Sequence, residues 1–473
     1  MTAVVGVDVG TSGVKASLVE VKGESVVELR STSVPYLAAN EPCRDPDRWV
    51  AASYEALDAL ELPGPVEGAG FSGQMHALVA LDGDGKPVHD ALLWLDYEGA
   101  PVLEKFISDH PEIDLLRRTG NVPLPDFTLA KWLMLQDRSP GVAGRAAHLV
   151  LAKDYVRGVL CADRWLTDWN EASGTQVFDP WRRDWAADVA AAASLPIALL
   201  PQVTEATTEV GVLRNRSGAV LSARCVVGTG DQASAARAVG VSRAGVVSLG
   251  LGTSGVVAGE IEAGMVGNNW DGGFHLFSLD ASEAFQVIGT VPSVGPTLRW
   301  VAQLLRVPVA KLGDLASASE SGPGGVAFLP YLGGRGAPHA DSAQSGGLVG
   351  LRETTTDAEI AQAVFVGIAL ELAAVIEELG QAGAKVCEVV CSGGASRDRH
   401  LLATIAAALE VPCRSASAAD ASSVGAALLG LDAIDATGLP RLAGGLVAPA
   451  GTPLYADAWR EARASLISEL SAR

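Results

Sequence analysis

The pentapeptide Gly-Thr-Ser-Gly-Val occurs twice in the chain, at residues 10–14 and again at 252–256. Each copy joins two apolar, alternating runs, so each predicts a strand, a tight turn and a second strand. Five identical residues can recur by chance in a chain rich in Gly and Ala. The shared context, and a spacing of about half the chain, instead favour a duplicated fold.

The length of the chain sets the expected number of domains. A chain of 473 residues is too long for one hydrophobic core, and 48% hydrophobic residues can fill two. Strand-like and helix-like runs alternate, which is typical of α/β domains. We expect an N-terminal domain at 1–240 and a C-terminal domain at 241–473. Within them we expect helices at 46–60, 128–136, 183–193, 232–239, 294–306, 357–379, 398–409 and 455–471, strands at 66–71 and 386–390, and a loop at 437–453.

The net charge of the chain limits the kinds of molecule that it can bind. The chain carries 55 acidic and 35 basic residues, a net charge of −20, which disfavours nucleic acid and anionic membranes as partners. An anionic ligand would need local devices such as backbone amides, helix N-termini or a metal ion. No signal peptide pattern or uninterrupted apolar run of membrane-spanning length is present, so we expect a cytoplasmic protein. The six cysteines lack metal-ligand spacing and predict reduced, mostly buried thiols.

The first hairpin has the chemistry of a phosphate site. Gly10 lets the turn approach a phosphate closely, and successive backbone amides with the hydroxyls of Thr11 and Ser12 supply donors. Asp8, at the end of the strand, suits Mg²⁺ held through water, and Lys15 lies on the return strand. The alternative is an ordinary Gly-rich hairpin. The second copy, with Gly252, Thr253 and Ser254, favours phosphate binding.

Asp231 is the best candidate for a catalytic residue. It follows Gly228-Thr229-Gly230 at a strand-to-helix turn, the edge where ligands bind in α/β folds. Its carboxylate can take the proton from a hydroxyl that attacks a phosphate, and Gln232 can hydrogen-bond sugar hydroxyls. The alternative is that Asp231 only caps the helix.

Two further runs suit small ligands. Gln74, Met75 and His76 follow a strand and could line a sugar pocket. The alternative for His76 is an ordinary loop histidine, which is the commoner case. Trp94 and Asp96 are weaker candidates, since a tryptophan is more often part of the core. Between a strand and a helix, Gly393, Gly394 and Asp398 could approach a nucleotide or simply form a tight connection.

Taken in order, these motifs resemble the FGGY carbohydrate kinases over essentially the whole chain. That resemblance implies two actin-like, ribonuclease H-like ATPase domains of the α/β class with a cleft between them. The matching positions are Asp8 to Lys15, Gly73 to His76, Ala91 to Asp96, Thr119 to Asn121, Phe127, Thr128, Lys131, Lys153 to Tyr155, Asp168, Ala172 to Thr175, Gly230, Asp231, Ser248 to Gly255, Phe328 to Leu332, Pro338, His339, Gly393 to Ala395 and Gly425 to Ala427.

The resemblance also implies roles for single residues. By matching position, Asp231 is the catalytic base, Asp8 lies near Mg²⁺, and Gly394 and Asp398 hold the adenosine of ATP. Met75 and His76 lie in a run most similar to members that phosphorylate D-xylulose. Thr11, Ser12, Thr253 and Ser254 surround the phosphates. The expected partners are a small sugar and ATP, and a homodimer is left open.

Several departures keep other acceptors open. Gln232 replaces a common Asn, and Leu95 interrupts a common Trp-Asn-Asp run that an Arg usually follows. Gly334 to Pro338 replaces Gly-Glu-Arg-Thr-Pro, and Ser248 to Thr253 carries two extra residues. Ribulose, gluconate, glycerol or another polyol therefore stay as alternatives. A nucleotide-dependent actin-like regulator without kinase activity is the alternative from another class, and a sugar-binding repressor is disfavoured because no basic helix-turn-helix precedes the first strand.

Overall fold

The computed structural model describes residues 2–23, 25–37, 41–162, 165–241, 245–266, 270–279, 284–416, 420–434, 441–442, 444–447 and 456–471. The chain forms two compact units. Unit 1 comprises Met1–Gly240, Gly267–Gln286 and Ala418–Leu442, and unit 2 comprises Val241–Val266, Val287–Ser417 and Ala443–Arg473. This differs from the expected division into 1–240 and 241–473, because two later segments pack with the first part of the chain.

Unit 1 is built on a mixed sheet with the strand order β11-β12-β4-β1-β2-β3-β22. Strand β1 runs antiparallel to β2 and parallel to β4, which places Asp8 opposite both Lys15 and Ser72. The predicted first hairpin, joining β1 to β2, is confirmed. The bounds are β1 Thr2–Val9, β2 Gly13–Lys22, β3 Ser25–Pro35, β4 Gly68–Gly73, β11 Glu209–Arg214, β12 Val220–Val226 and β22 Arg441–Leu442.

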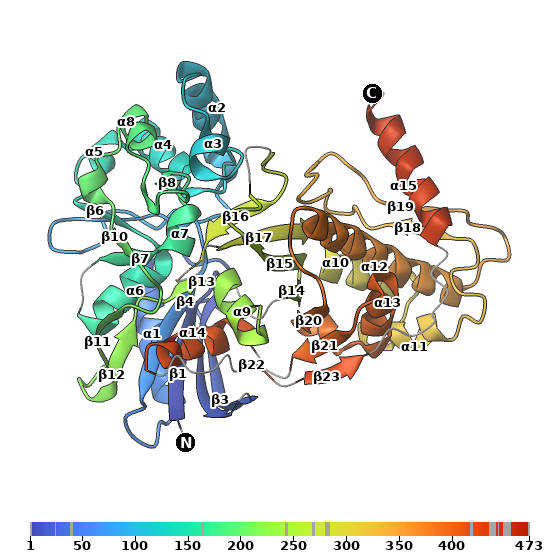
Figure 1. Ribbon diagram of the computed structural model, residues 1–473, viewed down its shortest axis with the longest axis horizontal. Coiled ribbons are helices and arrows are strands. Elements are labelled where there is room, and N and C mark those ends of the chain that lie inside the picture. The colour runs from blue at the N-terminus through green and yellow to red at the C-terminus, as the bar shows by residue number, and fades with distance from the viewer. Residues whose placement is uncertain are drawn as a thin grey trace. The chain divides into compact units, whose positions relative to one another are not determined.

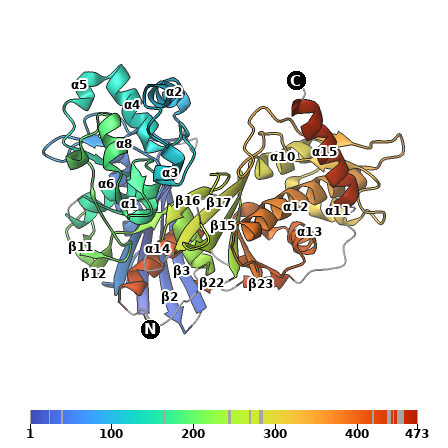
Figure 2. The same ribbon diagram turned by 45° about the horizontal axis from the view of Figure 1, so that its top comes forward.

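Successive residues of β1 face opposite sides of this sheet. Val5 and Val7 enter a core with Trp49 of α1 (Pro46–Ala59). On the other side lies α14 (Ala421–Asp432), labelled across the blue strands in Figures 1 and 2. A Cβ at Gly6 would lie 1.9 Å from the carbonyl oxygen of Ser423, so glycine is required for this close packing. This packing brings residues 418–442 into unit 1.

Helix α14 also crosses α9 (Asp231–Val239) at close range. The Ser234 hydroxyl donates to the Ser422 carbonyl at 2.7 Å, and the Ser422 hydroxyl donates to the Asp231 carbonyl at 3.3 Å. A Cβ at Gly425 would lie 1.7 Å from the Ser234 carbonyl oxygen. The start of α9 is therefore fixed by contacts from a segment about 190 residues later in the chain.

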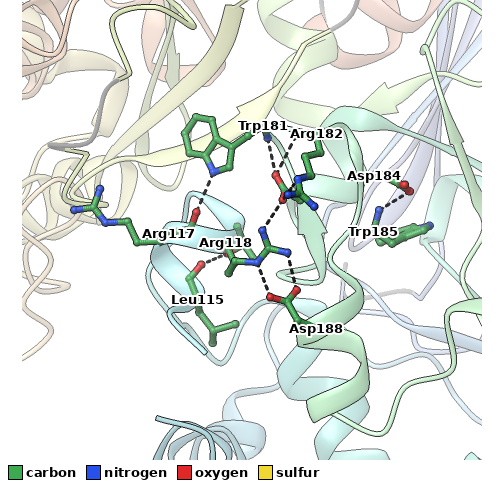
Figure 3. A network of polar contacts seen from close by, with 10 residues as sticks. Leu115, Arg117, Arg118, Trp181, Arg182, Asp184, Trp185 and Asp188 are labelled. Carbon is green, nitrogen blue, oxygen red and sulfur yellow. Dashed lines mark hydrogen bonds and ion pairs between the residues drawn. The ribbon is translucent and has the colours of Figure 1, made fainter. Parts of the chain in front are cut away.

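The remainder of unit 1 forms a second core around Leu129, Trp132 and Val189. An arginine network ties its parts together (Figure 3): Arg118 pairs with Asp179 at 2.8 Å and with Asp188 at 2.7 Å, and the Trp181 indole donates to the Arg117 carbonyl. The other elements of unit 1 are β5 Val79–Leu81, α2 Ala100–Asp109, α3 Leu115–Thr119, α4 Thr128–Arg138, α5 Pro140–Ala143, β6 His148–Val150, α6 Ala152–Cys161, β7 Leu166–Asp168, α7 Trp169–Ser173, β8 Phe178–Asp179, β9 Asp184–Trp185, α8 Ala187–Ala192, β10 Gln202–Thr204, β13 Thr229–Gly230, which pairs with β4 of the first sheet, and β16 His275–Ser278.

Unit 2 contains a sheet in which β17, β15, β14, β20, β21 and β23 are successive neighbours. The second copy of the pentapeptide turns β14 into β15, as predicted. Helices α12 and α13 lie side by side in both views (Figures 1 and 2). The bounds are β14 Val246–Leu251, β15 Gly255–Glu262, β17 Ala284–Val291, α10 Val294–Leu304, α11 Leu312–Ser317, β18 Ala327–Leu329, β19 Gly347–Val349, α12 Asp357–Gln381, β20 Glu388–Ser392, α13 Arg399–Leu409, β21 Cys413–Ala416, β23 Gly444–Val447 and α15 Ala456–Ser471.

Two of the expected elements need correction. The helix expected at 183–193 is confined to α8, because residues 184–185 pair in a small hairpin. The loop expected at 437–453 includes β22 and β23, whose backbones pair with β3 and β21, while its other residues lie outside those described. Five of the six cysteines are buried, Cys387 being exposed, and all six are free thiols.

Helix α12 is long and apolar enough, by length and composition, to cross a membrane. In the part of the chain that the structure describes it is the only such helix, and 83% of its apolar stretch is buried inside the protein. Such burial is typical of a core helix. Thr356 begins it with a capping box, in which its hydroxyl accepts from the Glu359 amide and the Glu359 carboxylate accepts from the Thr356 amide.

Candidate functional site

A cluster of carboxylates gathers in unit 1 around the first hairpin. Asp8 is 4% exposed and accepts a hydrogen bond of 3.0 Å from the Ser72 hydroxyl. Lys15 forms an ion pair with Asp420, the residue that caps α14. Asp231, at the start of α9, interacts electrostatically with Asp8 and Lys15. Residues from three distant parts of the chain thus meet at one site.

Burial and mutual repulsion perturb this cluster. Burial, followed by the charges of Asp420 and Asp231, raises the pKa of Asp8 to about 7 against the opposing effect of Lys15. Burial also raises the pKa of Asp231 to about 6, while hydrogen bonds from Gln232 lower it. Perturbation of this kind is common where carboxylates perform chemistry or bind cations.

The acidic cluster fits a cation held mostly through water. Within the described ranges, no group of three or more His, Cys, Asp or Glu side chains has a geometry that would hold a metal ion directly. Magnesium keeps several waters and takes only one or two protein carboxylates beside phosphate oxygens. The buried charge of Asp8 beside Asp420 and Asp231 fits such an ion.

The turn of the first hairpin is anchored by its carbonyl groups. The Tyr36 hydroxyl donates to the Gly10 carbonyl at 3.0 Å, and the Cys43 amide donates to the Thr11 carbonyl at 3.3 Å. The Trp94 indole donates to the Thr11 hydroxyl at 3.1 Å. Trp94 is 36% exposed, so the alternative that it belongs to the core is wrong. It lies instead against the hairpin, and Ser12 completes the turn.

Asp231 does not cap its helix. Gly230 holds the capping position, and Asp231 is the first helical residue of α9. The alternative interpretation of Asp231 as a cap is therefore wrong. Gln232 is the next residue of the helix, and its hydrogen bonding lowers the pKa of the Asp231 carboxyl. Its role in binding sugar stays a prediction.

His76 lies in an unusual backbone conformation with a φ of +66°. Its Nδ1 lies 2.7 Å from the Gly174 carbonyl oxygen, and burial lowers the pKa of the ring to about 4. A carbonyl only accepts, so the neutral ring carries its proton on Nδ1 and its Nε2 is an acceptor. Phe127 contacts the ring edge-on, with centroids 4.7 Å apart.

The neighbouring candidates have different surroundings. Met75 is 5% exposed, and a Cβ at Gly230 would lie 2.8 Å from its Cγ, so Met75 packs directly on the residue before Asp231. Gln74 is buried, and its Nε2 donates to the Gly10 carbonyl at 3.5 Å. Asp96 forms an ion pair with Arg44 and accepts from the Leu93 amide at 2.7 Å. Asp96 therefore shapes the loop that carries Trp94.

A buried charge network lies beneath the start of α9. The Lys153 ammonium lies 2.6 Å from Asp154 and 3.1 Å from Asp168. Asp168 in turn accepts from the Thr229 hydroxyl at 2.6 Å. Thr229 precedes Gly230 and Asp231, so this network fixes the backbone that presents the candidate base.

Unit 2 holds a cavity of about 1060 Å³ that includes three of the predicted nucleotide residues, Gly252, Gly394 and Asp398. Asp398 caps α13 by accepting from the His400 and Leu401 amides at 2.9 and 3.1 Å. Gly393 has a φ of +88°, and a Cβ there would lie 2.6 Å from the Leu251 carbonyl oxygen. Thr253 and Ser254 follow Gly252 in the turn. The cavity is large enough for a nucleoside.

Some of these contacts had no signal in the sequence. Asp420 begins a helix of small residues and carries no motif, although it neutralises Lys15. Asn170 and Gln286, which hydrogen-bond each other at 3.1 Å, lie 116 residues apart in segments without any ligand pattern. The folding of the chain brings such pairs together, and the local sequence does not predict it.

Comparisons with known proteins agree with this architecture. The model of the FGGY family of carbohydrate kinases matches with its N-terminal domain at residues 3–238 and with its C-terminal domain at 247–434. A xylulose kinase from Bacillus subtilis is 31% identical over 422 residues, covering 84% of this chain and 81% of that protein. A xyloylose kinase structure from Brucella ovis has a TM-score of 0.88 at 26% identity, covering 100% of both chains. A gluconate kinase structure from Lactobacillus acidophilus shares the fold with a TM-score of 0.86 at 21% identity, covering 98% of both chains.

These matches define the class of the protein as a carbohydrate kinase. The chain belongs to the FGGY family, whose models match both of its halves. The predicted fold, two actin-like and ribonuclease H-like domains of the α/β class, is confirmed.

Proposed function

We propose that the protein transfers the γ-phosphoryl group of ATP to the terminal hydroxyl of D-xylulose, giving D-xylulose 5-phosphate and ADP. The observation that carries the proposal is the position of Asp231 on a fixed strand-to-helix turn beside the acidic hairpin. The choice of sugar is supported by the xylulose kinase of Bacillus subtilis, which is 31% identical. The Met75-His76 pair supports the same sugar.

Asp231 acts as the general base in this proposal. Burial raises its pKa to about 6, so it is ionised at neutral pH and remains basic enough to accept a proton. The O–H bond of the sugar hydroxyl breaks as its proton passes to Asp231. The freed electron pair forms the new P–O bond, and the bond from the γ-phosphorus to the β-phosphate oxygen breaks to release ADP.

Asp8 and the two hairpins hold the phosphates. Asp8 would hold Mg²⁺ through water, and this ion would supply positive charge for the phosphate oxygens. Lys15 offers a second positive charge on the same strand pair, and Asp420 keeps its ammonium in place. Gly10, Thr11 and Ser12 contribute donors from the first hairpin, as do Gly252, Thr253 and Ser254 from the second.

The adenosine part of ATP occupies the cavity of unit 2. Gly393 and Gly394 allow the base and ribose to approach the backbone, and Asp398 caps the adjoining helix. Phe365 and Leu298 line the same cavity, as do the charged residues Arg299 and Arg397. Apolar walls suit a nucleoside base, and the polar groups can fix its orientation.

The acceptor sugar is the part of the proposal with a specific alternative. Gln232 and Leu95 depart from the xylulose kinase pattern, and the gluconate kinase of Lactobacillus acidophilus shares this fold. Gluconate, ribulose or glycerol would use the same Asp231 chemistry. These acceptors differ in their hydroxyl pattern, so measured rates separate them.

The test is a coupled assay of ADP release with ATP, Mg²⁺ and each acceptor. We expect the highest kcat/KM with D-xylulose and its loss in Asp231→Asn, while Asp137→Asn, an exposed surface change on α4, keeps the rate. A higher kcat/KM with another acceptor contradicts the sugar assignment alone. ADP release that no sugar increases contradicts the kinase and favours a nucleotide-dependent regulator.

A further inference from the structure

Asn170, in the short helix α7 of unit 1, is a buried polar residue with no role in the proposal above. It is 2% exposed, and its backbone N–H donates to Asp168 Oδ2 at 3.1 Å. The same Asp168 accepts from Thr229, one residue before Gly230. Asn170 is therefore fixed to the same network that holds the start of α9.

The orientation of the Asn170 side chain follows from its partners. Its Nδ2 donates to the Ser278 carbonyl at 3.2 Å and to Gln286 Oε1 at 3.1 Å. A backbone carbonyl only accepts, so nitrogen must face Ser278. Gln286 is fixed likewise, because its Nε2 donates to the Gln232 carbonyl at 3.3 Å and leaves Oε1 for Asn170.

This arrangement leaves Asn170 Oδ1 without a partner among the described residues. An unsatisfied acceptor in a buried position costs free energy comparable to a lost hydrogen bond, so a native site usually supplies a donor. A Cβ placed on Gly230 would lie 3.1 Å from Asn170 Oδ1 and 2.9 Å from Met75 Sδ. The open acceptor therefore lies beside the residue that precedes the candidate base.

The chemistry beside this atom calls for a ligand that donates hydrogen bonds. The carboxylate of Asp231, the residue after Gly230, is also an acceptor. A polyhydroxylated ligand can donate to both. Met75 also packs against Gly230, and its unbranched, flexible thioether side chain can shift to admit a hydroxyl.

We propose that Asn170 Oδ1 accepts a hydrogen bond from a hydroxyl of the acceptor sugar and is a specificity-determining residue of the site, oriented by Gln286. The inference rests on the proposed function for the identity of the sugar. It also gives the Gln232 carbonyl a role, because this carbonyl accepts from Gln286 Nε2 and so helps to orient Gln286.

The test measures sugar binding directly, without turnover. Isothermal titration calorimetry with D-xylulose compares the natural protein with Asn170→Ala and Asn170→Ser, and ATP titrations serve as the control. We expect Asn170→Ala to weaken sugar binding about 5- to 30-fold, the range for one hydrogen bond in a buried site, and to leave the Kd for ATP within about twofold. Asn170→Ser keeps a short acceptor and loses less.

Deoxy sugars identify the contact. Among 1-deoxy-, 3-deoxy- and 4-deoxy-D-xylulose, one analogue lacks the donor and binds Asn170→Ala and the natural protein equally. This comparison also holds with Asn170→Ser if the alanine variant does not fold. Gln286→Met removes the positioning contact to Asn170 together with the hydrogen bond to the Gln232 carbonyl, and it keeps Asn170 Oδ1, so it weakens sugar binding less than Asn170→Ala and leaves ATP binding unchanged.

The outcomes separate this inference from the function. Equal sugar affinity in Asn170→Ala and the natural protein overturns the role of Asn170, whatever the turnover. The role of Asn170 is also overturned if Asn170→Ala weakens the binding of every deoxy sugar by the same factor. Sugar that binds through Asn170 without ADP release leaves the inference in place and overturns the kinase proposal.

Discussion

Asp8 is held in the folded protein at a cost, and removing its charge should stabilise the ligand-free protein. The side chain is 4% exposed, and burial with the nearby Asp420 and Asp231 charges raises its pKa from 3.8 to about 7. Above pH 7 this shift costs the folded state up to about 4 kcal/mol. Asp8→Asn keeps the shape and removes the charge, so it should raise the free energy of unfolding by a large part of that amount.

The stabilisation expected from Asp8→Asn depends on pH. The folded state holds the Asp8 proton up to about pH 7, while the unfolded chain releases it near pH 3.8. Between these values the folded state binds more protons, so this group makes the protein less stable as pH rises. The gain from Asp8→Asn is therefore largest above pH 7 and vanishes below about pH 4.

Urea unfolding without nucleotide or Mg²⁺ measures the effect, with tryptophan fluorescence as the probe. Trp49 is fully buried in the core of unit 1 and reports on its unfolding. Asp137→Asn on the surface is the control and should change stability by less than about 0.5 kcal/mol. A less stable Asp8→Asn protein at pH 7.5, or a gain that is equal at pH 4 and pH 7.5, would refute the reasoning.

Three further predictions concern activity. Burial raises the pKa of Asp231 to about 6, so kcat/KM for the sugar should fall about tenfold per pH unit well below pH 6, and a flat profile down to pH 4 would contradict its role as base. Gly230→Ala places a methyl group 2.8 Å from Met75 Cγ, so the KM for the sugar should rise about tenfold with the KM for ATP unchanged. An unaltered sugar KM would count against the packing of Met75 on Gly230. Asp398→Ala removes a helix cap beside the unit 2 cavity, so unit 2 should lose about 1 kcal/mol of stability. The KM for ATP should rise while the KM for the sugar stays constant. A change in the sugar KM alone would contradict the assignment of this cavity to ATP.

The repeated pentapeptide made much of the fold predictable. Alternating apolar residues around glycine-rich turns specify hairpins locally, and both hairpins are present at β1–β2 and β14–β15. Helix α12 followed from its apolar periodicity for the same reason. Local sequence decides these elements because their hydrogen bonds and turns join residues close together in the chain.

The long-range part of the site could not be predicted in this way. Asp420 pairs with Lys15 only because α14 returns to the first sheet, where Gly6 leaves room for its backbone. Asn170 and Gln286 meet for a similar reason. No local period or motif encodes such contacts. For the same reason the sequence favoured a core position for Trp94, which instead donates to the Thr11 hydroxyl.

Product analysis tests the central claim most directly. The protein is incubated with ATP, Mg²⁺ and D-xylulose, and ³¹P NMR follows the phosphate. We expect a ketopentose phosphate ester to appear in equal amount to ADP, and Asp231→Asn to form neither while still binding ATP. Inorganic phosphate in place of the sugar ester, or normal ester formation by Asp231→Asn, would contradict it.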